Sequence, residues 1–95
     1  MTINQIQDFL RQQIVASAQK HFDITPESVA VEIPPRPELG DMAFPVAFEL
    51  AKLIKQTTGE KHNPRALAEA FKSDLESVEF VDHIDIAGPG YLNVF

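Results

Sequence analysis

Apolar side chains at helical spacing predict a helix at the start of the chain. From Ile3 to Ala18, apolar residues recur every three or four positions and form one stripe, while polar residues fall largely on the other side. Thr2 and Gln5 have the capping-box spacing, in which the hydroxyl accepts from the amide of residue 5 and the glutamine reaches back. We expect this amphipathic helix to end between Lys20 and Phe22, where a basic residue suits the helix dipole.

The spacing then changes to the two-residue period of a half-buried strand. Apolar residues alternate with other residues from Val29 to Ile33. Pro34 and Pro35 follow directly, and they end the strand because neither donates a ladder hydrogen bond. We therefore expect the first strand at residues 29–33.

Four prolines, one glycine and one aspartate between residues 34 and 45 predict an extended segment, a sharp turn and a helix entry, in that order. Gly40 supplies the free dihedral angles for the turn. Asp41 can accept amide hydrogens from the next helix as its N-cap; alternatively, Phe44 is the cap and Pro45 takes the first helical position. In both cases a helix with a wide apolar face follows.

We expect that helix to end near Thr57, and a polar loop separates it from a third helix. Asn63 and Pro64 place a capping side chain directly before a proline at the first helical position. Apolar residues at helical spacing then continue to Leu75.

Two strands joined by a turn are predicted at the end of the chain. Residues 78–87 alternate as in a strand, with a change of phase at residues 81–82 that indicates a bulge. The sequence Ala87-Gly88-Pro89-Gly90 is a turn, and Tyr91–Phe95 is the last strand.

The order helix, strand, two helices, strand, strand indicates an α+β domain. We expect two layers, with about three helices packed on one face of a small antiparallel sheet. The chain has 95 residues, of which 44% are apolar, enough for one hydrophobic core and no second one. Residues 1–95 are therefore expected to form a single domain, and a strand pattern that stops on Val-Phe indicates that the chain is truncated.

Composition limits the compartment and the classes of site. No apolar run approaches the roughly 20 residues that a membrane-spanning helix needs, and the N-terminus lacks the order of a signal peptide. The absence of cysteine excludes disulfides and thiolate metal sites. We expect a soluble cytoplasmic protein with no membrane partner.

The formal net charge of -6 argues against a general nucleic-acid binder, and against a DNA partner, because non-specific binding depends on clustered Lys and Arg. The distribution is uneven. Residues 52–72 carry five basic and two acidic side chains, and residues 73–86 carry five acidic side chains and no Lys or Arg. Two solvated faces are a sufficient explanation of this pattern.

The residues alone predict neither catalysis nor a metal site. The histidines at 21, 62 and 83 are far apart in sequence. The Gly88-Pro89-Gly90 turn lacks the helix and the lysine of a phosphate-binding loop, and no serine has a nucleophile elbow around it.

The last strand carries the one candidate binding pair. If Leu92 and Val94 face the core, Tyr91 and Asn93 point together from the other face. An aromatic ring can stack on a splayed base and an amide can hydrogen-bond the edge of that base, which is how unpaired RNA is commonly recognised. An edge aromatic beside an ordinary exposed amide is the alternative interpretation.

Four short motifs occur along almost the whole chain. They are Pro37-Glu38-Leu39-Gly40-Asp41, Leu50-Ala51-Lys52, Asn63-Pro64-Arg65 and Ala87-Gly88-Pro89-Gly90-Tyr91-Leu92-Asn93. In this order they resemble the N-terminal additional domain of arginyl-tRNA synthetases. The resemblance implies a two-layer α/β domain whose partners are tRNA(Arg), contacted at its D-loop, and the catalytic domain of the same chain.

The resemblance also implies the residues that bind tRNA. In that family an aromatic and an amide residue after the Gly-Pro turn read one D-loop base, and by position these are Tyr91 and Asn93, with Gly88 and Gly90 shaping the turn. Some members have a further amide where this chain has Ala87. The parent enzyme joins arginine to its tRNA with ATP as cofactor; the class I catalytic signatures are absent from these residues, so this fragment is expected to hold no cofactor and to have no catalytic activity unaided.

Phosphate contacts are expected from Arg36 and Lys52, on the expectation that the Gly40 turn lies beside the Gly88 turn. Two other functions remain open. The chain could be a docking module that uses the strand edge at residues 91–95 to pair with another domain. A small hydrolase-like enzyme using Arg36 and an asparagine is a third reading, although nothing in the sequence places a nucleophile.

Overall fold

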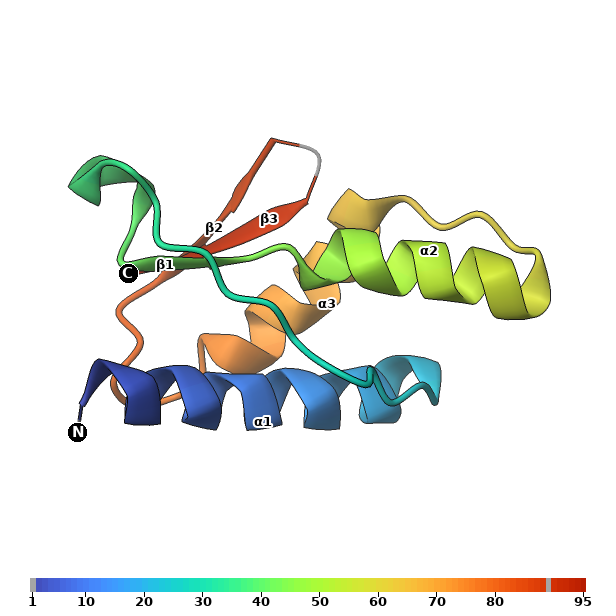
Figure 1. The fold of residues 1–95 in the computed structure, drawn as a ribbon, viewed down its shortest axis with the longest axis horizontal. Helices are drawn as coiled ribbons and strands as arrows, with labels where there is room; N and C mark the ends of the chain where they lie inside the picture. The colour runs from blue at the N-terminus through green and yellow to red at the C-terminus, as the bar shows by residue number, and fades with distance from the viewer. Residues whose placement is uncertain (1, 89) are drawn as a thin grey trace.

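A long amphipathic helix, α1 (Ile3–Phe22), opens the chain and runs along one side of the molecule (Figure 1). The computed structural model describes residues 2–88 and 90–95, with the side chain of Pro37 excepted. The capping box is present, since Gln5 N donates to Thr2 Oγ1 at 3.2 Å and Thr2 N donates to Gln5 Oε1 at 2.9 Å. Both predicted ends of this helix are confirmed.

The other two helices, α2 (Val46–Thr58) and α3 (Pro64–Leu75), also lie close to where the sequence predicts them. Asn63 caps α3, its Oδ1 accepting from Arg65 N at 3.0 Å. The predicted caps of α2 are wrong, because neither Asp41 nor Phe44 takes that position. Pro45 stands at the N-cap of α2 without a side-chain hydrogen bond.

The reason is a strand that the sequence analysis missed, β1 (Met42–Phe44). It lies on one side of β3 (Tyr91–Val94), and β2 (Ile84–Ala87) lies on the other, so the antiparallel sheet has the order β1-β3-β2. A short 3₁₀ turn, η1 (Pro37–Leu39), precedes β1. Because β3 is central, both of its edges are paired, and the predicted free edge at residues 91–95 is wrong.

The first predicted strand is reduced to a single bridge. Glu32 and Ala43 exchange two backbone hydrogen bonds of 2.8 Å, and residues 29–33 form no longer ladder. The prolines that follow Glu32 stop the pairing on one strand, and Pro45 limits β1 on the other. Residues 78–83 are also not a strand with a bulge, because turns continue from the end of α3 through residue 80 before β2 begins.

The helices cover one face of the sheet. α2 and α3 contact the strands directly, and α1 packs mainly on the far side of α3 (Figure 1). The α+β class with helices on one face of a small antiparallel sheet is confirmed. One cluster of buried apolar side chains lies between these layers, and its largest fully buried members are Phe44, Phe71, Leu10, Ile14, Leu50, Leu75, Ile84, Leu92 and Val46.

Gly40 allows β1 to approach β3. Its φ is +106°, and a Cβ placed there would lie 2.8 Å from the carbonyl oxygen of Val94. The next residue, Asp41, donates its backbone amide to that same oxygen at 2.8 Å. The glycine predicted for a sharp turn is therefore also required for the close contact between backbones.

A polar cluster joins α1 to the end of α3. Asp74 Oδ2 accepts from Ser17 Oγ at 2.6 Å and lies 3.0 Å from His21 Nε2, and Lys20 Nζ lies 3.6 Å from Asp74 Oδ1. The hydrogen bond from Ser17 is the largest influence, and with His21 and Lys20 it outweighs burial and holds the pKa of Asp74 below its ordinary value of 3.8.

This cluster predicts a pH-dependent stability. Because the pKa of Asp74 is lower in the folded state, its contribution is present above the unfolded-state pKa and is lost as the pH falls through the folded-state pKa. We expect Asp74→Asn to lower the free energy of unfolding at pH 7 by about 1.5–3 kcal/mol, as for hydrogen bonds to charged groups. The loss should shrink near pH 3. Urea denaturation at the two pH values measures it, with the exposed Asp8→Asn as control; an Asp74→Asn loss of equal size at both pH values would contradict the assignment.

Candidate nucleic-acid interface

The face of the sheet turned away from the helices carries the candidate site. In an antiparallel sheet, residues directly opposite each other share a face. Asn93 on β3 lies opposite Ala43 on one side and Asp85 on the other, and Glu32 lies opposite Ala43 through the bridge. We call these four residues the outer-face row. Tyr91 lies on the same face opposite Ala87, so the predicted shared orientation of Tyr91 and Asn93 is confirmed.

Tyr91 is half-buried because a second aromatic residue packs against it. Phe48, in the first turn of α2, has its ring centroid 5.0 Å from that of Tyr91, with the ring planes tilted by 60°. Contact with a helix that is itself fixed by the core limits the orientations of the tyrosine ring. The sequence analysis missed Phe48, and its one signal was a large aromatic in a helix whose inward face is already filled by aliphatic residues.

The alternative interpretation of Asn93 as an ordinary exposed amide is wrong, because this residue is only 7% exposed. Within the part of the chain that the structure describes, no residue hydrogen-bonds to its carboxamide, and no fully enclosed side-chain N or O atom is left without a partner. The carboxamide therefore keeps some access to solvent. Buried amides normally have partners, and a nearly buried amide without one has donors and an acceptor available to a ligand.

Two open grooves reach Asn93. One, of ≈ 330 Å³, lies beside Tyr91 and is lined by Pro34, Pro35 and other residues of the 32–39 segment. The second, of ≈ 430 Å³, runs along β2 and α3 and has charged walls. Leu39, Ala87 and Asn93 line both grooves, so the amide lies where the two meet.

Gly90 in the β2–β3 turn lets the backbone at the start of α3 come close. A Cβ at Gly90 would lie 3.1 Å from Pro64, at the start of α3. Arg65 Nη1 donates to Gly88 O at 2.8 Å. The turn is thereby fixed to α3, which holds Tyr91 and Asn93 in place; Pro89 of the predicted turn lies outside the described residues.

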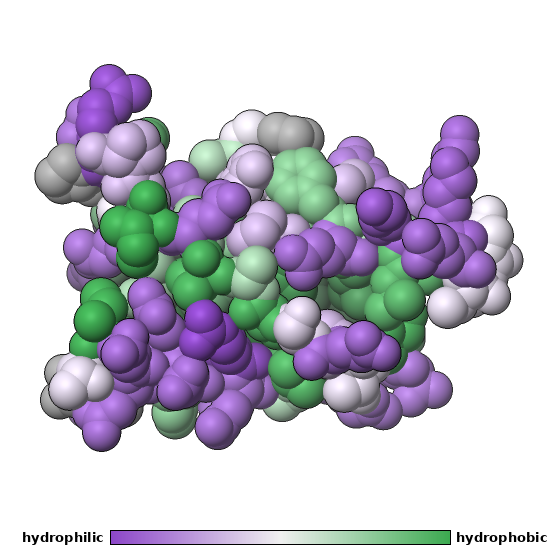
Figure 2. Space-filling model, viewed as in Figure 1, coloured by the Kyte–Doolittle hydropathy of each residue, from purple (hydrophilic) through white to green (hydrophobic). Residues whose placement is uncertain are grey.

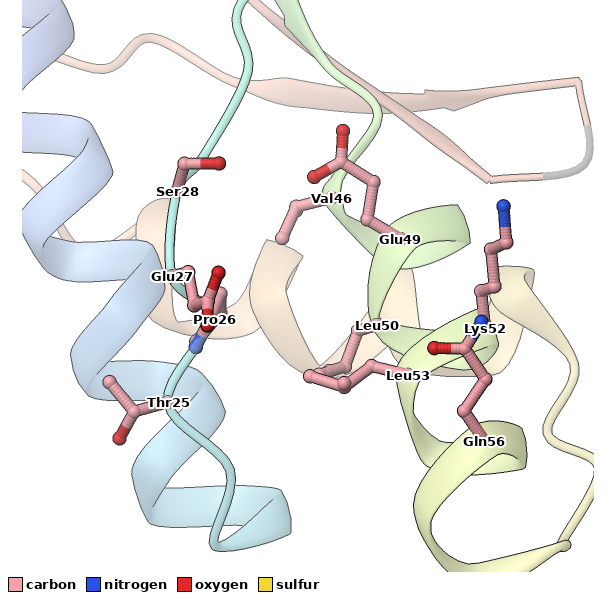
Figure 3. A pocket seen from close by; sticks show the side chains of 10 residues that line it. All are labelled: Thr25, Pro26, Glu27, Ser28, Val46, Glu49, Leu50, Lys52, Leu53 and Gln56. Atoms are coloured by element: carbon pink, nitrogen blue, oxygen red, sulfur yellow. The ribbon is translucent and has the colours of Figure 1, made fainter.

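The two predicted phosphate contacts differ in position. Lys52 lies one helical turn after Phe48 on α2, and Figure 3 shows its amine directed away from the loop at residues 25–28, toward the side of the β2–β3 hairpin. Arg36 is exposed and pairs with Glu38 at 3.7 Å. The expectation that the Gly40 turn lies beside the Gly88 turn is wrong. Met42 pairs with Val94 and Ala87 with Tyr91, so the two turns are at opposite ends of β3.

A further cleft, on the opposite side of α2, offers no comparable chemistry. It has a volume of ≈ 540 Å³ and lies between the loop at residues 25–28 and α2 (Figure 3). Leu50 and Leu53 form its floor, and apolar side chains show in the hollow between α1 and α2 in Figure 2. Its polar residues include Glu49 and Ser28 and no histidine, and no hydrogen-bonded nucleophile and base lie there among the described residues.

Two structural findings concern other kinds of site. Within residues 2–88 and 90–95, no group of three or more His, Cys, Asp or Glu side chains is placed to hold a metal ion. None of the helices in the described ranges combines the length and the apolarity that crossing a membrane requires.

The profile of the family described as Arginyl tRNA synthetase N terminal domain matches residues 4–95. The chain belongs to this family. The four motifs predicted membership of the arginyl-tRNA synthetase N-terminal domain family, and that prediction is confirmed.

Curated relatives of this N-terminal domain are arginine–tRNA ligases. The ligase of Renibacterium salmoninarum is 44% identical over 72 residues, which are 76% of this chain and 12% of the relative. That of Thermotoga petrophila is 35% identical over 90% of this chain and 14% of its own. That of Staphylococcus aureus is 34% identical over 98% of this chain and 16% of its own. The chain thus spans a small part of the length of these relatives.

Two solved structures share the fold of the N-terminal domain. Arginyl-tRNA synthetase from Plasmodium falciparum has a TM-score of 0.74 at 18% identity over 94% of this chain and 15% of its own. The enzyme of Thermus thermophilus has a TM-score of 0.67 at 28% identity, over 92% of this chain and 13% of its own. The first likeness, at such low identity, concerns the fold alone.

Proposed function

We propose that this chain is the tRNA-binding N-terminal domain of an arginine–tRNA ligase and that it recognises the D-loop of tRNA(Arg). Tyr91 stacks on one unpaired base, and the Asn93 carboxamide hydrogen-bonds the edge of that base. The observation that carries the proposal is Asn93 itself. An amide that is 7% exposed and has no partner among the described residues lies at the meeting point of two grooves, one of them beside an aromatic ring.

Other residues support this contact. Gly88 and Gly90 shape the turn that fixes β3 to α3, and Lys52 is placed to meet a phosphate on the α2 side of Tyr91. Arg36 is a weaker candidate for a phosphate contact because Glu38 partly neutralises it. These contacts position the tRNA without specifying its sequence.

The wider function of the protein follows from the family. We propose that residues 1–95 are one domain that precedes a catalytic domain in the same chain, and that the whole cytoplasmic enzyme uses ATP to join arginine to its tRNA. The N-terminal domain contributes recognition and no catalytic group. Docking onto that catalytic domain is the second candidate function. Because both edges of β3 are paired, docking would use a surface other than the edge of that strand.

Side-chain amide NMR of the 95-residue chain tests the proposal. We expect an unmodified tRNA(Arg) transcript to shift the carboxamide resonances of Asn93, while those of Asn63, which caps α3, stay in place. Binding should be weak, because a domain of net charge -6 gains little from phosphates. Shifts that appear only when the rest of the enzyme is added, and none with tRNA, would favour the docking function instead.

A further inference from the structure

The outer-face row has a regular order of charge. Across the sheet it reads carboxylate, methyl, amide, carboxylate, from Glu32 through Ala43 and Asn93 to Asp85. Neighbouring strands are roughly 4.8 Å apart, so Asp85 is one strand spacing from Asn93 and Glu32 is two. Both carboxylates are exposed, the Asp85 side chain by 64%. The nearly buried amide therefore lies between two fixed negative charges.

The other charges around the two grooves do not cancel this pair. Glu38 and Glu69 add two carboxylates to the charged groove, against Arg65 and Lys72. The guanidinium of Arg65 donates to the carbonyl oxygen of Gly88, at the hairpin turn. Among the described residues, the side chain of Asp85 has one charged neighbour, His83, whose Nε2 lies 4.0 Å from Asp85 Oδ2. The immediate surroundings of Asn93 remain negative.

These negative charges repel the phosphate of a nucleotide but not its base. A phosphate approaching the amide meets two like charges, and in water each unit charge at 6–10 Å costs on the order of 0.5 kcal/mol. The edge of a nucleobase is neutral and can give amino hydrogens to carboxylates. Lys52 lies one helical turn after Phe48, the residue that packs against Tyr91, and its amine would attract a phosphate there.

We propose that Glu32 and Asp85 are specificity-determining residues that keep RNA phosphates out of the two grooves and leave the Asn93 amide to the edge of an unpaired base. The inference deepens the proposed function and rests on it. In this proposal, the carboxylates repel the phosphates while Tyr91 and Asn93 attract the base. Combining repulsion with attraction is a general way to achieve specificity. Duplex RNA, which presents phosphates and no splayed base, is the ligand that the two carboxylates reject.

The experiment compares two RNA probes on the full-length protein. Dissociation constants are measured for an unmodified tRNA(Arg) transcript and for a duplex RNA with the same number of phosphates. The variants are Glu32→Gln, Asp85→Asn and their combination. Glu60→Gln is the matched control, because it removes one exposed carboxylate from the α2–α3 loop, outside both grooves. Tyr91→Ala is measured in parallel, and thermal melting checks that each variant is folded.

We expect each row variant to tighten duplex binding relative to tRNA binding by about twofold to threefold at low salt, and the effect to fade in high salt because screening removes it. Glu60→Gln should leave the ratio of the two affinities unchanged. An unchanged ratio in the row variants, or an equal change in the control, would overturn the role of the carboxylates. If Tyr91→Ala weakens tRNA binding in the same experiment, the tRNA-binding function stands even though the carboxylates have no role in it. If Tyr91→Ala has no effect on tRNA binding, the proposed tRNA-binding function is itself wrong.

Discussion

Tyr91→Ala in the full-length enzyme is expected to raise the KM for tRNA(Arg) by a factor of about 5 to 150, which corresponds to the ~1–3 kcal/mol that stacking on one base contributes. The ring is held by Phe48, whose centroid lies 5.0 Å away, so a base can stack on it without first paying to order it. Under the proposed function, the contact belongs to a domain without catalytic groups, and we expect it to act equally in the ground state and the transition state. The value of kcat should therefore change little.

Two further variants make this result specific to the base contact. Tyr91→Phe keeps the stacking surface and should remain close to the parent enzyme. Asn93→Leu keeps the approximate shape of a residue that is 7% exposed while removing its donors and acceptor, so it should raise the KM and leave the fold intact. Aminoacylation kinetics over a range of tRNA concentrations measure all three. Unchanged kinetics in both Tyr91→Ala and Asn93→Leu would remove the base-reading role from this strand.

Phe71→Ala is expected to lower the free energy of unfolding of the 95-residue chain by about 3–5 kcal/mol. Phe71 is fully buried in α3, the helix that lies between α1 and the sheet, and its ring centroid is 6.0 Å from that of Phe22. Truncating this side chain leaves a cavity bordered by α1, α3 and the sheet, which cannot all move inward to fill it. A domain of this size is stable by roughly 5–15 kcal/mol, so the loss is a large fraction of the total.

Phe80→Ala is the control for that loss. Phe80 is 42% exposed and touches Phe9 edge to face at 5.4 Å, on the surface beside α1. Urea denaturation at pH 7 should give a much smaller change for this variant. Equal losses for the two phenylalanines would show that the core is not centred on α3.

The local elements could be predicted because their causes lie within a few residues. Thr2 and Gln5 specify the start of α1 through two hydrogen bonds across three residues. Asn63 specifies the start of α3 through one hydrogen bond to Arg65 N, with Pro64 at the first helical position. The helical period then places the buried residues of each helix. All three helices lie close to their predicted bounds for this reason.

The strands were less predictable because their partners are distant in sequence. Asp41 has the chemistry of a helix cap, yet its amide bonds Val94 across more than 50 residues and the next three residues become β1. At 29–33 the alternation has the period of a strand, but β1 is too short and too closely followed by Pro45 to extend the single bridge at Glu32. Nothing local distinguishes these cases.

By itself, the sequence determined the three helices, the glycine turn and the fact that Tyr91 and Asn93 share one face, because a period of 3.6 or 2 residues and a cap are properties of neighbouring residues. Only the tertiary structure decided that β3 is central, that Asn93 is nearly buried and that Phe48 supports Tyr91. It also gathered Glu32 and Asp85 around the amide from segments more than 50 residues apart in sequence. Those features depend on the register of long-range pairing, which the packing of the whole core selects.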